Sequence, residues 1–309
     1  MKKVVSTLKL DRKEWLKYRK QGIGGSDAGA VCGLNPYRTA MQVYQDKISE
    51  ETEEVDDNEA MRQGRAFEDY VARRFMEATG KRVRRANTMF YDEKNPFMLA
   101  DVDRMVVGEN AGLECKTASP YMADKWKDGN IPLSYQIQCY HYMSVCNADA
   151  WYIAVVIYGR EFKYYKIERD EAVIADLIQI EKTFWENHVL KRELPDPDGT
   201  KLADSVIAEY YKDSVADTIP LTGFNEKLER RQELAELIGR MEMEKKKIEQ
   251  ELKLYLGENE RAENEQFTVS WKSVQSSRVD EKRLKEEEPE IYEKYKKSIS
   301  SRRLTVKAT

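Results

Sequence analysis

Asp103, Glu114 and Lys116 have the residue types and the spacing of a metal-dependent site that cleaves phosphate esters. Successive side chains of a strand alternate between two faces, so a strand through 114–116 would present Glu114 and Lys116 on one side. If Asp103 on a neighbouring strand faces the same way, two carboxylates converge, and the backbone carbonyl of Cys115 adds a third oxygen ligand. We expect Mg²⁺ there, with Mn²⁺ as a substitute, because magnesium prefers oxygen ligands. A lysine beside the ion could orient or deprotonate an attacking water and stabilise charge on a phosphate.

Two apolar runs must place these residues next to each other. Residues 97–107 and 111–116 flank Gly108-Glu109-Asn110, which is typical of a tight connection between two strands. An E-x-K triplet by itself is also common on the solvated face of an amphipathic strand, since 35% of the residues in this chain are charged. The elements around the strands therefore decide between the two interpretations.

Two helical patterns supply further polar side chains. Glu68 lies in a pattern whose apolar positions are Phe67, Val71 and Phe75. Gln136 lies in a second helical pattern that runs from 134 to 146. Taken singly, the glutamate could be an ordinary exposed helix charge and the glutamine a half-buried polar group.

In their order along the chain, these residues resemble the PD-(D/E)XK nuclease superfamily, and within it the YqaJ-like viral recombinases related to phage lambda exonuclease. That family has a helix glutamate, a strand aspartate, E-x-K and a glutamine helix. The matching positions here are Glu68, Asp103, Glu114, Lys116 and Gln136. The resemblance covers about residues 10 to 190 and departs at Val102, which stands where the superfamily's name has a proline.

The resemblance implies an α+β fold, with an α/β/α restriction-endonuclease-like core in which helices flank a mixed sheet, and a helical C-terminal appendage. It assigns the binding of one or two Mg²⁺ ions to three acids and one backbone carbonyl: Asp103, Glu114, Glu68 and that of Cys115. Lys116 would position or deprotonate the nucleophile. Gln136 would orient Lys116 or the attacking water.

A glycine-rich turn near the N-terminus forms a second candidate site. The glycines within 22–25 permit a tight turn, and Ser26 is a suitable N-cap for a helix that begins at Asp27. The free amides at a helix start favour an anion. With Arg19 nearby, they could bind a terminal DNA phosphate, and the resemblance assigns that role to Arg19 and Ser26. An ordinary helix cap is the alternative.

A basic segment stands out against the net charge of −4, which by itself disfavours non-specific binding to nucleic acid. Local charge matters more than the total, and residues 81–85 are all basic except Val83. We expect three arginines to contact the DNA backbone: Arg82, Arg84 and Arg85. The alternative for such a segment is a solvated loop.

The domain organisation follows from breaks in pattern along the 309 residues. We expect a nuclease core over 1–194, a linker region over 195–222 that opens with a proline-rich stop, and a C-terminal part over 223–309. Apolar residues recur at helical spacing from 224 to 256, which predicts a long amphipathic helix that pairs within the chain or between subunits. Two short strands are expected at 266–272 and 302–306, with a helix over about 280–296 between them.

Targeting signals and cysteine chemistry are both sparse. No apolar run approaches the ~20 residues of a transmembrane helix, and the N-terminus lacks a signal-peptide core, so we expect a cytoplasmic protein with no membrane partner. The cysteines, at 32, 115, 139 and 146, contain no C-x-x-C pair. They are expected to be free thiols rather than ligands of zinc or an iron–sulfur cluster.

Two classes of function fit these residues. By resemblance, the first is a Mg²⁺-dependent exonuclease of a phage or prophage recombination module. It would bind the ends of linear double-stranded DNA, degrade one strand 5′ to 3′, and leave a 3′ single strand for an annealing protein of the RecT or Red-beta kind. Relatives form a homo-oligomeric ring, commonly a trimer.

Other readings of the same residues stay open. A structure-selective endonuclease or a CRISPR-type relative would share the core, but a pocket for a terminal phosphate has little use in an internal cutter. The second class is a non-catalytic DNA-binding or scaffold protein, which would have no chemical reason to retain Glu68, Asp103, Glu114 and Lys116 together.

Overall fold

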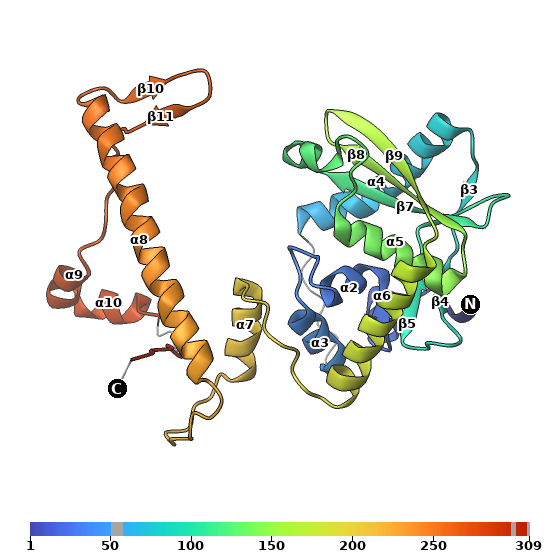
Figure 1. The fold of residues 1–309 in the computed structure, drawn as a ribbon, viewed down its shortest axis with the longest axis horizontal. Helices are drawn as coiled ribbons and strands as arrows, with labels where there is room; N and C mark the ends of the chain where they lie inside the picture. The colour runs from blue at the N-terminus through green and yellow to red at the C-terminus, as the bar shows by residue number, and fades with distance from the viewer. Residues whose placement is uncertain (51–57, 298–300, 308–309) are drawn as a thin grey trace. The chain divides into compact units, whose positions relative to one another are not determined.

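The computed structural model describes residues 1–50, 58–297 and 301–307. The chain divides into two compact units, Met1–Tyr211 and Lys212–Thr309 (Figure 1). All the candidate site residues lie in the first unit, so its sheets and helices are considered first.

The first unit contains two β-sheets. Strands β7 (Ala111–Ala118) and β8 (Ala150–Ile157) pair in parallel at the centre of a five-stranded mixed sheet. Its order is β3 (Val83–Arg84), β6 (Arg104–Val106), β7, β8 and β9 (Glu161–Glu168). The second sheet has the order β1 (Lys2–Ser6), β4 (Thr88–Tyr91), β5 (Met98–Asp101) and β2 (Ile23–Gly24).

Strand β8 shows how the five-stranded sheet is covered on both faces. Its odd-numbered residues from Trp151 to Ile157 pack into one core cluster, together with Cys139 and Met143 of α5 (Leu133–Cys146). Its even-numbered residues pack into another cluster, with Phe75 of α4 (Glu59–Thr79). Alternation along a strand sends successive side chains to opposite faces, so helices cover both sides of the sheet. The predicted helix–sheet–helix core is confirmed.

Shorter helices close the first unit beside the sheets. These are α1 (Arg12–Arg19), α2 (Gly25–Val31), α3 (Ala40–Ile48) and α6 (Glu171–Phe184), the last continuing into a π-helical turn over Trp185–Leu190. A seven-residue 3₁₀ segment, η1, covers Pro120–Trp126. Ile23, Val43 and Phe184 pack together and join these helices to β2.

The end of the first unit differs from the prediction. The region 195–222 does not form one linker, because α7 (Lys201–Tyr210) lies inside it. Ala203 and Val206 of α7 are buried against Met41 of α3. The proline-rich stretch is therefore an irregular connection within the first unit, and the boundary falls after Tyr211.

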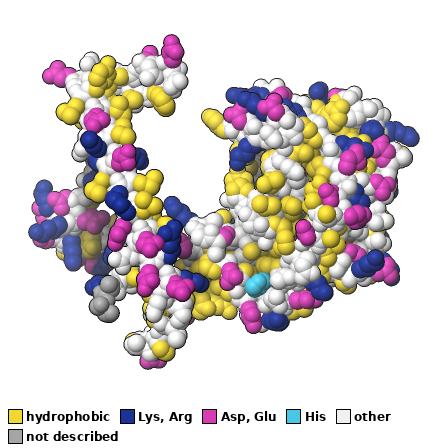
Figure 2. Space-filling model, in the orientation of Figure 1, with side chains coloured by type: hydrophobic (Ala, Val, Ile, Leu, Met, Phe, Trp, Pro, Cys, Tyr) yellow, Lys and Arg dark blue, Asp and Glu magenta, His cyan; other side chains and the backbone are white. Residues whose placement is uncertain are grey.

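The second unit is built around α8 (Asn225–Leu256), which confirms the predicted long helix. Apolar side chains alternate with charged ones along its exposed surface (Figure 2). A hairpin of β10 (Arg261–Glu263) and β11 (Thr268–Ser270) follows. The strand predicted at 302–306 is wrong, since those residues form no strand, and β11 pairs with β10 instead.

The predicted helix over 280–296 is two helices, α9 (Glu281–Glu287) and α10 (Pro289–Tyr295). Pro289 begins the second helix, because a proline suits the first turn but not a helix interior.

No helix within the described ranges has the length and apolar character needed to cross a membrane.

Candidate functional site

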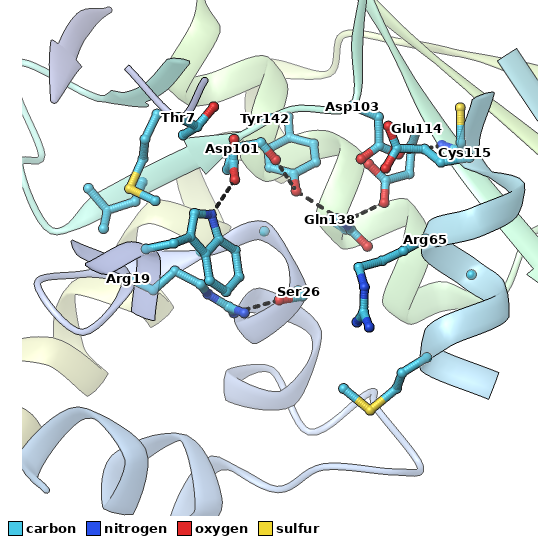
Figure 3. Close-up of a pocket in the computed structure, with 18 of the residues that line it drawn as sticks. Thr7, Arg19, Ser26, Arg65, Asp101, Asp103, Glu114, Cys115, Gln138 and Tyr142 are labelled. Atoms are coloured by element: carbon cyan, nitrogen blue, oxygen red, sulfur yellow. Dashed lines mark hydrogen bonds between the residues drawn. The ribbon is translucent and has the colours of Figure 1, made fainter. Parts of the chain in front are cut away.

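A cleft of about 790 Å³ in the first unit collects most of the candidate residues. Its lining includes Glu114 and Lys116 from β7, Glu68 from α4, and Arg19 and Ser26 from the N-terminal segment. Residues distant in sequence are thus brought to one surface (Figure 3). The cleft has an acidic part around β7 and a basic part around α1 and α2.

Strand β7 places Glu114 and Lys116 on the same side, as the alternation predicted. Lys116 Nζ lies 2.6 Å from Glu114 Oε1. Glu114 is buried, and its other oxygen, Oε2, has no hydrogen-bond partner among the described residues. An unpartnered buried carboxylate oxygen is energetically costly, so this atom suits a cation ligand.

Asp103 lies close to Glu114 but not within a strand. The predicted run 97–107 is broken, because β5 ends at Asp101 and β6 begins at Arg104, and these strands belong to different sheets. Asp103 occupies the bend between them, where its Oδ2 accepts a 2.7 Å hydrogen bond from the backbone N–H of Cys115. Burial, reinforced by the Glu114 and Glu68 carboxylates, raises the pKa of Asp103 well above its usual value.

The oxygen atoms of Asp103 and Glu114 are of the chemical type that binds a divalent cation. The half-buried carboxylate of Asp103 and the buried one of Glu114 repel each other, and a hard cation would relieve this repulsion and would also give the unpartnered oxygen of Glu114 a partner. No group of three or more His, Cys, Asp or Glu side chains is arranged for a metal in the described part of the chain. Asp103 and Glu114 supply two side-chain donors, and the Cys115 carbonyl stays a predicted third.

Glu68 lines the cleft, but its carboxylate is engaged elsewhere. Arg104, which is buried, forms short ion pairs with Glu68 and with Asp69. Its Nη1 also donates to the backbone carbonyl of Asp103 at 2.6 Å. Direct metal binding by Glu68 would require it to leave Arg104. Sequence reasoning missed Arg104, because arginine is seldom buried and nothing in its neighbours predicts that it would be.

Lys116 is held on three sides. Besides Glu114, it donates to Gln138 Oε1 at 3.0 Å, and its ammonium lies 4.7 Å from the centre of the Tyr135 ring. Burial alone would lower the pKa of Lys116, but Glu114, Tyr135 and Asp103 together raise it. In this arrangement Lys116 is a cation that donates hydrogen bonds, which suits positioning of the nucleophile rather than its deprotonation.

The glutamine predicted to orient Lys116 is the wrong one. Gln136 donates to the backbone carbonyl of Ile131 at 2.7 Å, and among the described residues it forms no hydrogen bond with the acids or the lysine. Gln138 takes that place: its Nε2 donates to Glu114 Oε1 at 2.7 Å while its Oε1 accepts from Lys116. Residues two apart in a helix point in different directions, so only one of the two can face β7.

Tyr142 joins the acidic and basic parts of the cleft. Its hydroxyl donates to the backbone carbonyl of Asp101 at 3.2 Å and accepts from Gln138 Nε2 at 3.1 Å. Its ring lies against Gly25, where an added Cβ would come within 2.5 Å of a ring carbon. The glycine at this position is therefore needed for α2 to approach α5.

Asp101 and Trp15 form a contact that sequence reasoning also missed. Trp15 Nε1 donates to Asp101 Oδ2 at 2.6 Å. The guanidinium groups of Arg12 and Arg19 lie 4.4 and 5.1 Å from the centre of the Trp15 ring, within the range of cation–π attraction. Trp15 stands four residues before Arg19, but nothing in the sequence indicates that Asp101 is its partner.

Arg19 and Ser26 lie together at the basic part of the cleft. Arg19 Nη2 donates to Ser26 Oγ at 2.7 Å and to Asp27 Oδ1 at 2.9 Å. The predicted helix start is wrong by two residues, because α2 begins at Gly25 with Gly24 as its N-cap. Asp27 accepts from the Gly24 N–H, so the aspartate caps the turn and the Ser26 hydroxyl is left to the cleft.

The basic segment is brought to the site only in part. Arg85 lies beside Glu68 and Asp103 in a smaller adjoining pocket and pairs with Asp69 at 2.6 Å. Arg82 and Arg84 are exposed, and neither lines that pocket or the main cleft. Of the three, Arg85 is the residue best placed to contact a strand that enters the cleft.

Comparisons with known proteins identify relatives of this chain. The family model of the YqaJ-like viral recombinase domain matches residues 14–149. The uncharacterized protein YqaJ of Bacillus subtilis (strain 168) is 37% identical over 306 residues, which cover 96% of this chain and 95% of that protein.

Two crystal structures of LHK-Exo, an alkaline exonuclease from Laribacter hongkongensis, have a similar fold. One of them is a complex with dAMP. Both are 20% identical to this chain and cover 58% of it and 96% of their own length, with TM-scores of 0.51 and 0.50. The fold, the sequence relative and the matched domain point the same way: the chain belongs to the family of the YqaJ-like viral recombinase domain.

Proposed function

We propose that the protein is a Mg²⁺-dependent exonuclease that acts on the ends of linear double-stranded DNA. One observation carries the proposal: the half-buried Asp103 and the buried Glu114, with an unpartnered Glu114 oxygen, stand beside the cation of Lys116 in an open cleft. Metal-assisted hydrolysis of a phosphodiester needs this combination of hard ligands and a fixed positive donor. Membership in the family and the exonuclease-like fold support the same activity.

Asp103 and Glu114 would hold the ion, with help from the Cys115 carbonyl. When bound, Mg²⁺ (or Mn²⁺) would polarise the scissile phosphate and lower the pKa of a coordinated water. The hydrogen bond from the Cys115 N–H fixes one oxygen of Asp103, which leaves the other for coordination. Glu68 would bind a second ion or its water only after release from Arg104.

Lys116 would stabilise the negative charge that grows on the phosphate and would hold the attacking water. Its ammonium is already oriented by Glu114, Gln138 and the ring of Tyr135. A donor that needs no reorganisation during the reaction contributes most to catalysis. Gln138 fixes both Glu114 and Lys116, so it takes the role first expected of Gln136.

Arg19 and Ser26 favour an exonuclease over an endonuclease. Both face the cleft that contains the acids, and an arginine with a hydroxyl can bind the oxygens of a terminal phosphate. An enzyme that reads a 5′-phosphate beside its hydrolytic site would degrade that strand from 5′ to 3′. The 3′ strand would remain for an annealing protein of the RecT or Red-beta kind, and a ring of subunits would retain the duplex.

The direct test uses linear duplex DNA with one phosphorylated and labelled 5′ end, beside a covalently closed circle. We expect nucleotide release from the labelled end only with Mg²⁺ or Mn²⁺, and an intact circle. Cleavage of the circle would instead favour the endonuclease, and no cleavage of either DNA would favour the binding protein. Asp103→Asn serves as the matched inactive control, because it keeps the side chain's shape and removes its charge.

A further inference from the structure

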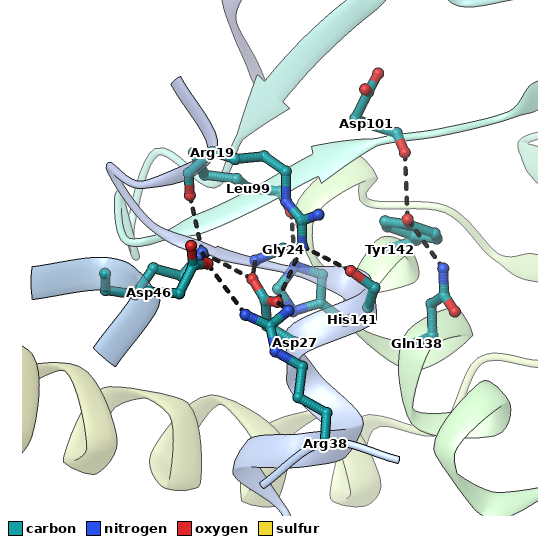
Figure 4. A network of polar contacts seen from close by, with 12 residues as sticks. Arg19, Gly24, Asp27, Arg38, Asp46, Leu99, Asp101, Gln138, His141 and Tyr142 are labelled. Carbon is teal, nitrogen blue, oxygen red and sulfur yellow. Dashed lines mark hydrogen bonds and ion pairs between the residues drawn. The ribbon is translucent and has the colours of Figure 1, made fainter. Parts of the chain in front are cut away.

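Asp27 is a buried carboxylate at the centre of a network of polar contacts next to the basic part of the cleft (Figure 4). Its Oδ1 accepts from Arg19 Nη2 at 2.9 Å and from Arg38 Nη1 at 2.6 Å. Its Oδ2 accepts from Lys47 Nζ at 2.8 Å and from the Gly24 N–H at 3.1 Å. Asp27 is fully buried and does not line the cleft, so it cannot itself meet a ligand there.

Asp27 balances much of the positive charge in this network. Three cations, Arg19, Arg38 and Lys47, share two carboxylates, Asp27 and Asp46, and only Asp27 touches all three. The Lys47 side chain is fully buried and also donates to the backbone carbonyl of Arg19 at 2.9 Å. Removing one partner of a buried ion pair leaves an uncompensated charge, so the geometry around Arg19 depends on the carboxylate.

The network fixes Arg19 by one edge. Both side-chain hydrogen bonds of Arg19 in the described residues start from Nη2, one to Asp27 and one to Ser26 Oγ. A guanidinium has five N–H donors, so those of Nε and Nη1 are left for a ligand. Ser26 Oγ accepts from Arg19, which leaves its own O–H to donate. The Trp15 ring adds a contact to the guanidinium.

We propose that Asp27 is the positioning residue that aims Arg19 and Ser26 at the terminal phosphate of the DNA strand. The inference rests on the proposed function. Asp27 orients Arg19 directly, and it orients Ser26 through Arg19 and through the first turn of α2, where it accepts from the Gly24 N–H. Without its charge, Arg19 would be free to leave Ser26, and the two donors would no longer converge on one phosphate.

The test compares two substitutions that each neutralise a fully buried carboxylate. Asp27→Asn alters the network around Arg19. Glu181→Gln alters a different buried pair, in which Glu181 Oε1 lies 2.8 Å from His141 Nδ1, and this pair does not contact Arg19. Rates are measured on linear duplexes that differ only in a 5′-phosphate or a 5′-hydroxyl. A purely structural role would change both rates together, so the ratio of the two rates is the informative quantity.

We expect wild type and Glu181→Gln to prefer the phosphorylated end equally. In Asp27→Asn the preference should fall about tenfold or more, through a higher KM for the phosphorylated DNA with kcat little changed, as for loss of a charge-assisted hydrogen bond. Adding Asp27→Asn to Arg19→Gln should produce no further loss of preference, because both act through one group. Folding is checked by circular dichroism.

Each failure has a separate signature. An inactive wild type would overturn the proposed function itself, and an active wild type without phosphate preference would overturn the phosphate site together with the role of Asp27. A preference retained in Asp27→Asn would overturn only the role of Asp27. If that variant does not fold, Asp27→Glu replaces it, since one added methylene displaces the carboxylate and should also reduce the preference. An unchanged preference in Asp27→Glu would equally overturn the role.

Discussion

The backbone N–H of Cys115 donates to Asp103 Oδ2 at 2.7 Å, which joins the bend between two sheets to the strand that carries Glu114 and Lys116. The aspartate is thereby held beside the glutamate by a main-chain contact rather than by a neighbouring strand position. A carboxylate that accepts from a backbone amide keeps its orientation when side chains around it are changed. Substitutions in the cleft should therefore affect chemistry more than the arrangement of the acids.

Lys116→Ala should remove cleavage and leave DNA binding largely intact. The ammonium is the fixed positive donor beside the acids, and loss of such a donor costs about 100-fold or more in rate. Single-turnover cleavage and gel-shift binding on the same linear duplex measure the two properties. Lys166→Ala is the control, since Lys166 pairs with Glu168 on an exposed part of β9. Cleavage at the wild-type rate in Lys116→Ala would remove this lysine from the mechanism.

Gln138→Ala and Gln136→Ala should differ sharply in activity. Gln138 bridges Glu114 and Lys116, whereas Gln136 contacts the Ile131 carbonyl. Partners that orient metal ligands contribute about 10- to 100-fold, and we expect that loss of kcat for Gln138→Ala only. The Mg²⁺ dependence of the rate in each variant provides the measurement. Equal losses in both variants would mean that the assignment of Gln138 is mistaken.

Arg104→Gln should destabilise the protein more than Arg85→Gln, although both arginines pair with Asp69. Arg104 is buried, whereas the Arg85 side chain is 55% exposed. Loss of hydrogen bonds to charged groups inside the protein costs about 1.5–3 kcal/mol. An exposed pair contributes about 0–1 kcal/mol. Urea unfolding of the two variants measures the difference, and equal midpoints would contradict it.

The stability contributed by Asp27 should disappear in acid. Burial would raise the pKa of Asp27, but Arg19, Lys47 and Arg38 together hold it well below the usual value of 3.8. A carboxylate with a depressed pKa in the folded state stabilises the protein above its unfolded pKa, and the contribution is lost as the pH falls further. The gap in unfolding free energy between wild type and Asp27→Asn should be constant from about pH 7 to 5 and shrink below 3.8.

Urea titrations at several pH values measure that gap. Glu181→Gln provides the comparison, because burial raises the pKa of Glu181 instead of lowering it. Its gap from wild type should not show the same loss below pH 3.8. A gap for Asp27→Asn that widens in acid would show that the carboxylate is not held in its charged form.

Local periodicity predicted the part of the site that lies on one strand. Alternation alone places Glu114 and Lys116 together, and that relation holds in any sheet. The choice between Gln136 and Gln138 was not accessible in the same way. Each fits a helical pattern, and the face that turns toward β7 is decided by how α5 packs on the sheet.

Contacts between segments were the least predictable. The sequence of residues 97–107 resembles one strand. In the structure it contributes β5 to one sheet and β6 to the other, because the chain turns at Val102 and Asp103. The burial of Arg104 and the pairing of Trp15 with Asp101 depend on neighbours from other elements. Ser26 was expected to cap a helix, but Asp27 accepts the cap hydrogen bond and has three cations around it.

Tyr142 connects the basic part of the cleft to its acidic part. Its ring is pressed against Gly25 of α2, and its hydroxyl contacts Gln138, which in turn contacts Glu114. The residues proposed to bind the phosphate and the acids are therefore linked through the contacts of one side chain. In the proposed function, a strand end bound at Arg19 would therefore meet Asp103 and Glu114 at a position that depends on these contacts of Tyr142.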